Sequence, residues 1–216
     1  MHIVKALGSL CAAFALAATG AAHAGDTPTM NAQVMRINKE WARIKYRVPD
    51  RKDQYTQLDQ LATQAAQLAA KYPGHAEPLL WEGIVTSEEA AQASMLKKMG
   101  LASSARDILE KAYKIDPMAG KGGVAMSLGV LYYKVPGWPI GFGSSAKARK
   151  YLEQALSADP NGLDANWFYG DYWASQGDKK KARTYFNKAL AAPADPNRPV
   201  WDAGRRAEVR DALAKL

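Results

Sequence analysis

Hydrophobic and polar residues follow one another along most of this chain with the period of an amphipathic α-helix. Apolar side chains recur three or four positions apart in several long segments, alanine is frequent, and prolines fall between the segments. Such a pattern indicates helices, because the apolar residues then share one face. Alternating runs of β-branched residues, which are typical of strands, are almost missing from the sequence. We therefore predict an all-α protein.

Three of the predicted helices end in similar sequences, which are LEKAYKIDP, LEQALSADP and FNKALAAPADP. Each contains a bulky residue, a small alanine three positions later, and then a proline. The alanines are Ala112, Ala155 and Ala189, separated by 43 and 34 residues. A period of 34 residues is that of tetratricopeptide repeats, in which each repeat is a pair of antiparallel helices. The sequence therefore predicts a solenoid of helical hairpins.

One complete tetratricopeptide repeat is matched by the stretch LDANWFYGDYWASQGDKKKARTYFNKALAA, residues 163–192. Gly170 takes the place of the small residue in the first helix, and Ala182 and Ala189 take the small positions in the second. Small residues are needed there because they let two helix backbones approach closely. The bulky residues that would fill the adjoining space are Tyr169, Trp173 and Phe186. The match departs at Asn166, where the pattern often has tryptophan.

Two earlier repeats follow the same plan but contain longer inserts. Their matching residues are Gly83, Ala105, Leu109 and Ala112 in one repeat, and Gly129, Ala148, Leu152 and Ala155 in the other. Extra residues separate the glycine from the first alanine in both. The predicted divisions are N-terminal helices over 25–75, three repeats over 76–119, 120–162 and 163–192, and a C-terminal capping helix over 193–216.

The stretches YYKVPGWPIGFG, NWFYGDYWASQGD and RPVWDAGRRAEVRDALAKL carry a further resemblance. In these, the chain resembles a family of exported proteobacterial tetratricopeptide-repeat proteins, loosely akin to the T component of TRAP transporters. The resemblance implies a scaffold that binds a protein or peptide partner. The alternative that it implies is an accessory protein that presents a small molecule.

The N-terminus has the features of a secretory signal peptide. Lys5 precedes an apolar run, and Ala22 and Ala24 frame a cleavage site of small residues. A membrane anchor would need roughly 18 uninterrupted apolar residues, whereas this run is broken at Thr19 and Gly20. We therefore expect cleavage after Ala24 and a periplasmic protein without a membrane span.

Few residue types suited to catalysis or metal binding remain after such cleavage. The single cysteine and two of the three histidines lie before residue 25, which leaves His75 in a predicted turn. Neither a multi-histidine metal site nor a cysteine nucleophile can then be built. The best acidic pairs, Glu88 with Glu89 and Asp164 with Asp171, lack a second catalytic element. We expect no enzyme activity, no metal and no cofactor.

The formal net charge of the chain is +8, which raises the question of an anionic partner. Export argues against nucleic acid. An acidic protein surface or peptide and an anionic surface of the cell envelope are both compatible with the charge, and so is a solvated surface without any partner, which is the favoured interpretation. The oligomeric state is left open by the sequence.

The predicted binding surface is the concave face of the solenoid, which the first helix of each repeat lines. Helical periodicity selects inward positions on these helices. They are Leu80, Ile84 and Glu88 in the first repeat, Met126, Val130 and Lys134 in the second, and Trp167, Asp171 and Ser175 in the third. The alternative is that the apolar members seal neighbouring helices.

A second candidate is the insert of the middle repeat, KVPGWPIGFGSS, with its two prolines and three glycines. Such residues favour a loop of one definite shape. Trp138 and Phe142 are costly to leave in water, so we expect them either to cover the helices as a plug or to form the wall of a ligand site. The plug is the favoured interpretation.

Overall fold

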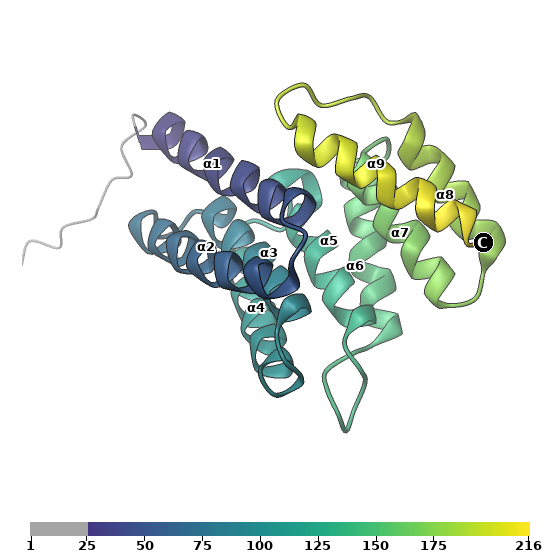
Figure 1. The fold of residues 1–216 in the computed structure, drawn as a ribbon, viewed down its shortest axis with the longest axis horizontal. Coiled ribbons are helices and arrows are strands. Elements are labelled where there is room, and N and C mark those ends of the chain that lie inside the picture. The colour runs from purple at the N-terminus through teal and green to yellow at the C-terminus, as the bar shows by residue number, and fades with distance from the viewer. Residues whose placement is uncertain (1–25) are drawn as a thin grey trace, which may run out of the picture.

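The structure of the protein is a computed structural model that describes residues 26–216; the predicted signal peptide lies outside the described residues. Nine helices form this part of the chain (Figure 1). They are α1 (Asp26–Arg47), α2 (Arg51–Lys71), α3 (Ala76–Gln92), α4 (Met95–Ile115), α5 (Ala119–Lys134), α6 (Ser145–Ala158), α7 (Leu163–Ser175), α8 (Lys179–Ala191) and α9 (Pro199–Ala214). The predicted all-α fold is confirmed. Within residues 26–216, none of the helices combines the length and the apolar character that crossing a bilayer requires.

Helices α3 and α4, α5 and α6, and α7 and α8 form the three predicted hairpins. At the equivalent glycine of each first helix, the second helix comes so close that a Cβ atom would find no room. A Cβ at Gly83 would lie 2.5 Å from Leu109 Cγ, one at Gly129 would lie 2.7 Å from Leu152 Cγ, and one at Gly170 would lie 2.6 Å from Phe186 Cδ1. The matching alanines of the second helices are buried. The residues that the sequence assigned to equivalent positions therefore pack equivalently.

The two inserts that stretch the earlier repeats have different structures. The first lengthens the helices themselves, since α3 and α4 have 17 and 21 residues whereas α7 and α8 have 13 each. The second is a loop between α5 and α6, which extends beyond the ends of the helices at the lower edge of Figure 1. Asp50, Ser144 and Asp178 cap the N-termini of α2, α6 and α8 with their side chains.

Asn166 replaces the tryptophan of the repeat pattern without leaving a gap. The residue is fully buried, and its side-chain nitrogen donates to the carbonyl oxygens of Pro160 and Gly162, both at 2.9 Å. It therefore holds the turn that precedes α7. The neighbouring Trp167 stacks on Phe186, with ring centroids 5.1 Å apart.

The first helices of the hairpins form an inner layer that closes on itself. Helix α1 contacts α3, α3 contacts α5, α5 contacts α7, α7 contacts α9, and α9 contacts α1 again. One hydrophobic cluster accordingly joins the first and the last of the described helices, from Ile44 in α1 to Val209 in α9. Gly204 permits this contact, because the ring of Tyr46 lies where a Cβ of that residue would be. In Figure 1 α1 and α9 meet at the top of the molecule.

Candidate functional site

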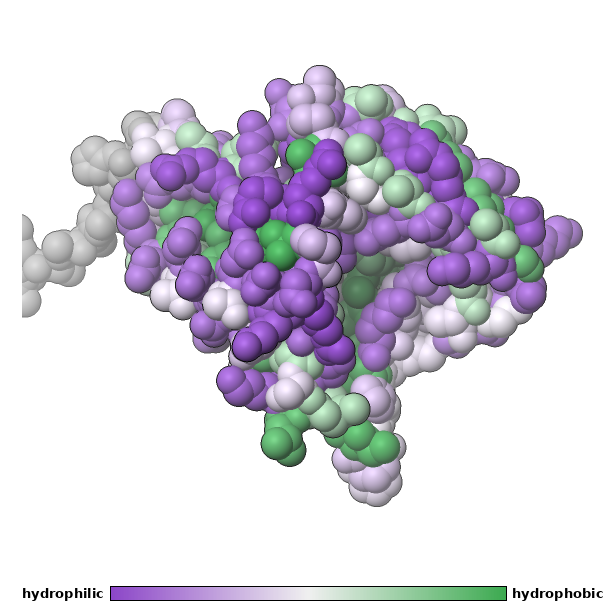
Figure 2. Space-filling view, in the orientation of Figure 1, coloured by the Kyte–Doolittle hydropathy of each residue, from purple (hydrophilic) through white to green (hydrophobic). Residues whose placement is uncertain are grey.

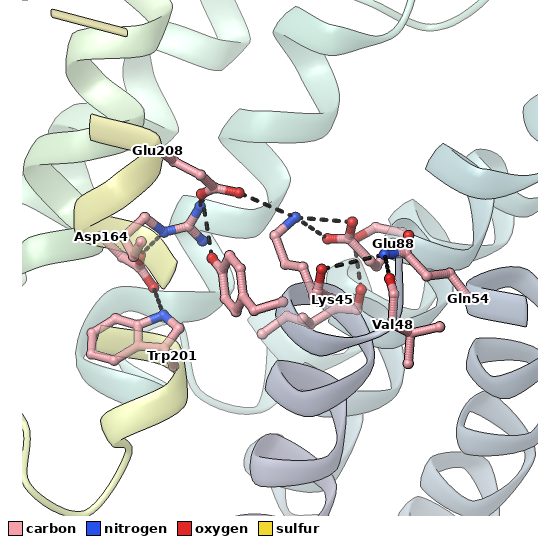
Figure 3. A network of polar contacts seen from close by, with 11 residues as sticks. Lys45, Val48, Gln54, Glu88, Asp164, Trp201 and Glu208 are labelled. Atoms are coloured by element: carbon pink, nitrogen blue, oxygen red, sulfur yellow. Dashed lines mark hydrogen bonds and ion pairs between the residues drawn. The ribbon is translucent and has the colours of Figure 1, made fainter. Parts of the chain in front are cut away.

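The inner layer carries a network of ion pairs where α1 and α9 meet α3 and α7 (Figure 3). Lys45 of α1 lies at the centre of this network, with its Nζ atom 2.9 Å from Glu88 of α3 and 3.7 Å from Glu208 of α9. The Tyr46 hydroxyl donates to the same Glu208 carboxylate at 3.3 Å. Three helices that are distant in sequence are thus joined by complementary charges.

Arg205 forms the other half of the network and is 4% exposed. Its Nε atom donates to Asp164 of α7 at 2.6 Å, and its Nη1 atom donates to Glu208. The guanidinium carbon lies 4.7 Å from the ring centroid of Phe168. Burial lowers the pKa of Arg205, but the charges of Asp164 and Glu208 outweigh that effect and raise the pKa above its ordinary value. Arg205 is therefore a fixed positive charge that ties α9 to α7.

The apolar members of the predicted concave surface are largely involved in helix packing. Leu80 is 3% exposed and packs against α5, where its side chain approaches Gly123. Helix α5 covers this side chain, which therefore faces a neighbouring helix and not the concave surface, so its assignment to the binding surface is corrected. Ile84, Met126 and Val130 are half-buried and pack against the hydrophobic clusters between the repeats.

The polar members lie closer to solvent but already have partners within the chain. Glu88 pairs with Lys45 as described. Lys134 Nζ lies 2.6 Å from Asp171, whose carboxylate also accepts the Tyr133 hydroxyl at 2.6 Å. Burial and the charge of Asp171 raise the pKa of Tyr133, so its phenol stays a donor. Figure 2 shows a hollow with a hydrophobic floor between the two halves of the molecule. That a partner contacts the predicted concave residues stays a prediction.

A groove of about 780 Å³ runs between α1 and α2 and is lined by residues of both helices. Its base consists of the side chains of Ile37, Leu61 and Leu68. Along α1 it extends from Gln33 to Arg43, which is about 15 Å at the rise of a helix. In Figure 2 hydrophobic atoms lie between the hydrophilic rims of these two helices. The groove is therefore open to solvent between polar rims, and at its base only the edges of these three core side chains reach it, since they are 7%, 2% and 7% exposed.

Basic side chains dominate the charge of the groove rim. Arg36, Lys39, Arg43 and Lys71 line it, together with Glu40 and three glutamines. Arg43 is neutralised by Glu40, whose carboxylate lies 2.8 Å from its guanidinium. Within the described part of the chain, no carboxylate lies within ion-pair distance of the other three basic residues.

The tip of the loop in the middle repeat does not cover the helices, although the plug interpretation predicted that it would. Trp138 is 90% exposed, so the expectation that it covers the helices is wrong. The backbone of the loop bonds to itself, with Gly143 N donating to Pro136 O at 2.9 Å and Gly141 N donating to Gly137 O at 3.1 Å. These bonds direct the tip away from the helices. Phe142 does pack, against Tyr132 and beneath Arg106.

Comparison with known proteins agrees with the arrangement of helical hairpins. Residues 141–199 match the family model described as tetratricopeptide repeat. The fold is a tetratricopeptide-like helical solenoid. Among solved structures, the chain is similar to a thermophilic tetratricopeptide-repeat protein of Thermus thermophilus, with 16% sequence identity, a TM-score of 0.57, and coverage of 88% of this chain and 93% of the other. No curated protein matches the sequence significantly.

Tetratricopeptide solenoids are generally scaffolds for protein interaction, and they are generally not enzymes. The repeat pattern of the sequence did not indicate the groove between α1 and α2, because the rim residues of the groove belong to no repeat motif. It also missed Lys45, Arg205 and Glu208. The wide polar face of α1, with Arg36, Lys39 and Arg43 one turn apart, is the feature that could have indicated the groove.

Proposed function

We propose that this protein is an exported scaffold that binds an acidic amphipathic helix of a partner protein in the groove between α1 and α2. The observation that carries the proposal is the combination of an apolar base and a basic rim in one open groove of about 780 Å³. A helix inserts its apolar face into such a groove and leaves its polar flanks to the rim. Carboxylates on these flanks would meet Arg36, Lys39 and Lys71.

The concave face is the less suitable surface for an extended partner. Its charged residues are paired across the inner layer, so a partner there would have to break ion pairs such as Lys45–Glu88 and Lys134–Asp171. Unpaired buried or half-buried charges are costly. The groove between α1 and α2 imposes no such cost, because three of its basic side chains have no ion-pair partner among the described residues.

The test is quantitative capture of partners by crosslinking, followed by titration of the captured protein against purified variants. The double variant Arg36→Glu, Lys39→Glu reverses two rim charges, and we expect it to weaken binding by about tenfold or more. The matched control is Lys180→Glu, Arg183→Glu on α8, which changes the net charge equally at exposed positions.

Three outcomes are distinguishable. Loss of binding in the α1 variant but not in the α8 variant supports the groove. Equal loss in both shows a general charge effect and contradicts the proposal. Loss confined to Lys134→Ala, Trp167→Ala, with normal binding by the α1 variant, places the partner on the predicted concave face instead.

Export is part of the proposal and rests on the sequence features of residues 1–24. We expect the chain, cleaved after Ala24, in the periplasmic fraction, with a melting temperature unaffected by reductant because no cysteine remains. Recovery of the uncleaved chain with the inner membrane would favour the anchor interpretation.

The second candidate is a small-molecule-presenting accessory protein of the TRAP T-component kind. The observation that favours it is the closed inner layer, which surrounds the hollow seen in Figure 2. A ligand held there would raise the thermal midpoint of the wild type and of the α1 charge variant alike. Lys134→Ala, Trp167→Ala would remove that increase.

A further inference from the structure

One end of the molecule presents large hydrophobic side chains to solvent from two separate segments. Met95 and Leu96, at the start of α4, are 82% and 96% exposed, and Trp138 and Ile140, in the loop after α5, are 90% and 73% exposed. The lower edge of Figure 2 shows two hydrophobic protrusions at this end. We call these four residues the apolar tip. Isolated exposed apolar residues are ordinary, but a group of four this exposed indicates an interaction surface.

The two segments of the apolar tip are held together by packing. Met99, one turn into α4, lies against the loop, since a Cβ at Gly141 would be 2.8 Å from its terminal methyl group. On the inner side of the loop, Phe142 lies beneath the guanidinium of Arg106, which also belongs to α4, at 4.5 Å from the ring centroid. The apolar tip is therefore a joint feature of α4 and the loop, with a fixed spacing between its two protrusions.

Basic side chains surround the apolar tip. Lys97 and Lys98 follow Leu96 directly, and Arg51 donates to the carbonyl oxygens of Gln92 and Ala93 just before it, at 3.1 and 3.2 Å. On the other side, Lys147 lies in the first turn of α6, next to the loop. Arg106 is offset by Asp107, which lies 2.7 Å away. Four further cationic groups thus flank the exposed apolar residues.

We propose that the apolar tip docks this protein onto the surface of an anionic phospholipid bilayer. Convex apolar protrusions insert into a fluid interface without needing a complementary shape, whereas a protein partner would need two sockets at a fixed spacing. An exposed indole suits the headgroup region, because its ring is apolar and its N–H is polar. Flanking lysines and arginines are attracted to anionic headgroups. The protein would lie on the membrane without spanning it.

The experiment is sedimentation of the purified protein with vesicles of phosphatidylcholine alone or of an equimolar mixture of phosphatidylcholine and phosphatidylglycerol. We expect binding to the mixed vesicles, much weaker binding to phosphatidylcholine, and weaker binding at high salt. Leu96→Ser, Trp138→Ser should lower the partition coefficient by about tenfold or more. The matched control is Ile115→Ser, Met118→Ser, which replaces exposed apolar residues at the other end of α4 and in the turn that follows it.

Tryptophan emission supplies a measurement of position. Addition of mixed vesicles should shift the emission of the wild type to shorter wavelength, because Trp138 leaves water. Trp138→Phe should keep most of the binding but lose this shift. The proposal is overturned if the wild type does not sediment with mixed vesicles, or if tip and control variants bind equally. It is also overturned if Leu96→Ser, Trp138→Ser abolishes only a self-association seen by analytical ultracentrifugation, since the tip would then join two copies of the chain.

Discussion

Replacement of Arg205 by methionine tests whether the ion-pair network holds α9 against the repeats. The substitution keeps an unbranched apolar side chain but leaves Asp164, Glu208 and the ring of Phe168 without the guanidinium. Removing one partner of a fully buried ion pair costs about 3–5 kcal/mol. Because the side chains of Asp164 and Glu208 retain 22% and 33% of their exposure, water offsets part of this cost. We expect the free energy of unfolding to fall by about 2–3 kcal/mol.

Urea denaturation followed by circular dichroism measures this change, with the midpoint expected to fall and the denaturant slope to stay constant. The control is Arg210→Met, an exposed arginine on the same helix, for which we expect a change within about 0.5 kcal/mol. A double-mutant cycle with Asp164→Asn isolates the pair, and a coupling energy above about 1 kcal/mol is expected. If Arg205→Met unfolds at the same urea concentration as the control, the network does not stabilise the closed inner layer and the reasoning fails.

Three further predictions concern packing, ionisation and the loop. Gly129→Ala should lower the free energy of unfolding by about 1–3 kcal/mol, because its methyl group would collide with Leu152; an unchanged urea midpoint would contradict this. Burial and the hydrogen bond to Glu153 raise the pKa of Tyr169 to about 12, so the stability from its neutral phenol is present below about pH 10 and is lost as pH rises toward 12. Tyr169→Phe should therefore lose less stability than the wild type over that interval in alkaline denaturation. Trp138→Ala should leave the unfolding free energy within about 0.5 kcal/mol by calorimetry, whereas a loss of about 3 kcal/mol or more would restore the plug interpretation.

The repeats could be predicted from the sequence because their determinants are local. A glycine such as Gly170 and an alanine such as Ala182 face each other within one hairpin, so the same residue types must recur at similar spacing in every repeat. The boundaries between helices were partly accessible as well, because prolines fall between the predicted segments and cannot continue a helix. The all-α solenoid follows from these local rules.

The closed inner layer and its ion-pair network could not be predicted in the same way, because they depend on contacts between segments that are distant in the sequence. Tyr46 and Gly204 lie 158 positions apart and belong to no repeat, so no periodic pattern relates them. Their contact brings α9 against α1 and thereby encloses the concave face. The exposure of Trp138 was mispredicted for another reason. The hydrophobicity of a side chain gives the free-energy cost of its exposure, but it does not show whether the loop can fold back onto the helices.

The contact between α1 and α9 also sets the number of repeats that this architecture can contain. An open solenoid can gain or lose a hairpin, because each repeat contacts only its neighbours and the array simply becomes longer or shorter. Here the first and last inner helices are also neighbours of each other. An additional hairpin would separate them and expose the hydrophobic cluster that they share. Duplication of a repeat is therefore compatible with this fold only if the contact between α1 and α9 is lost.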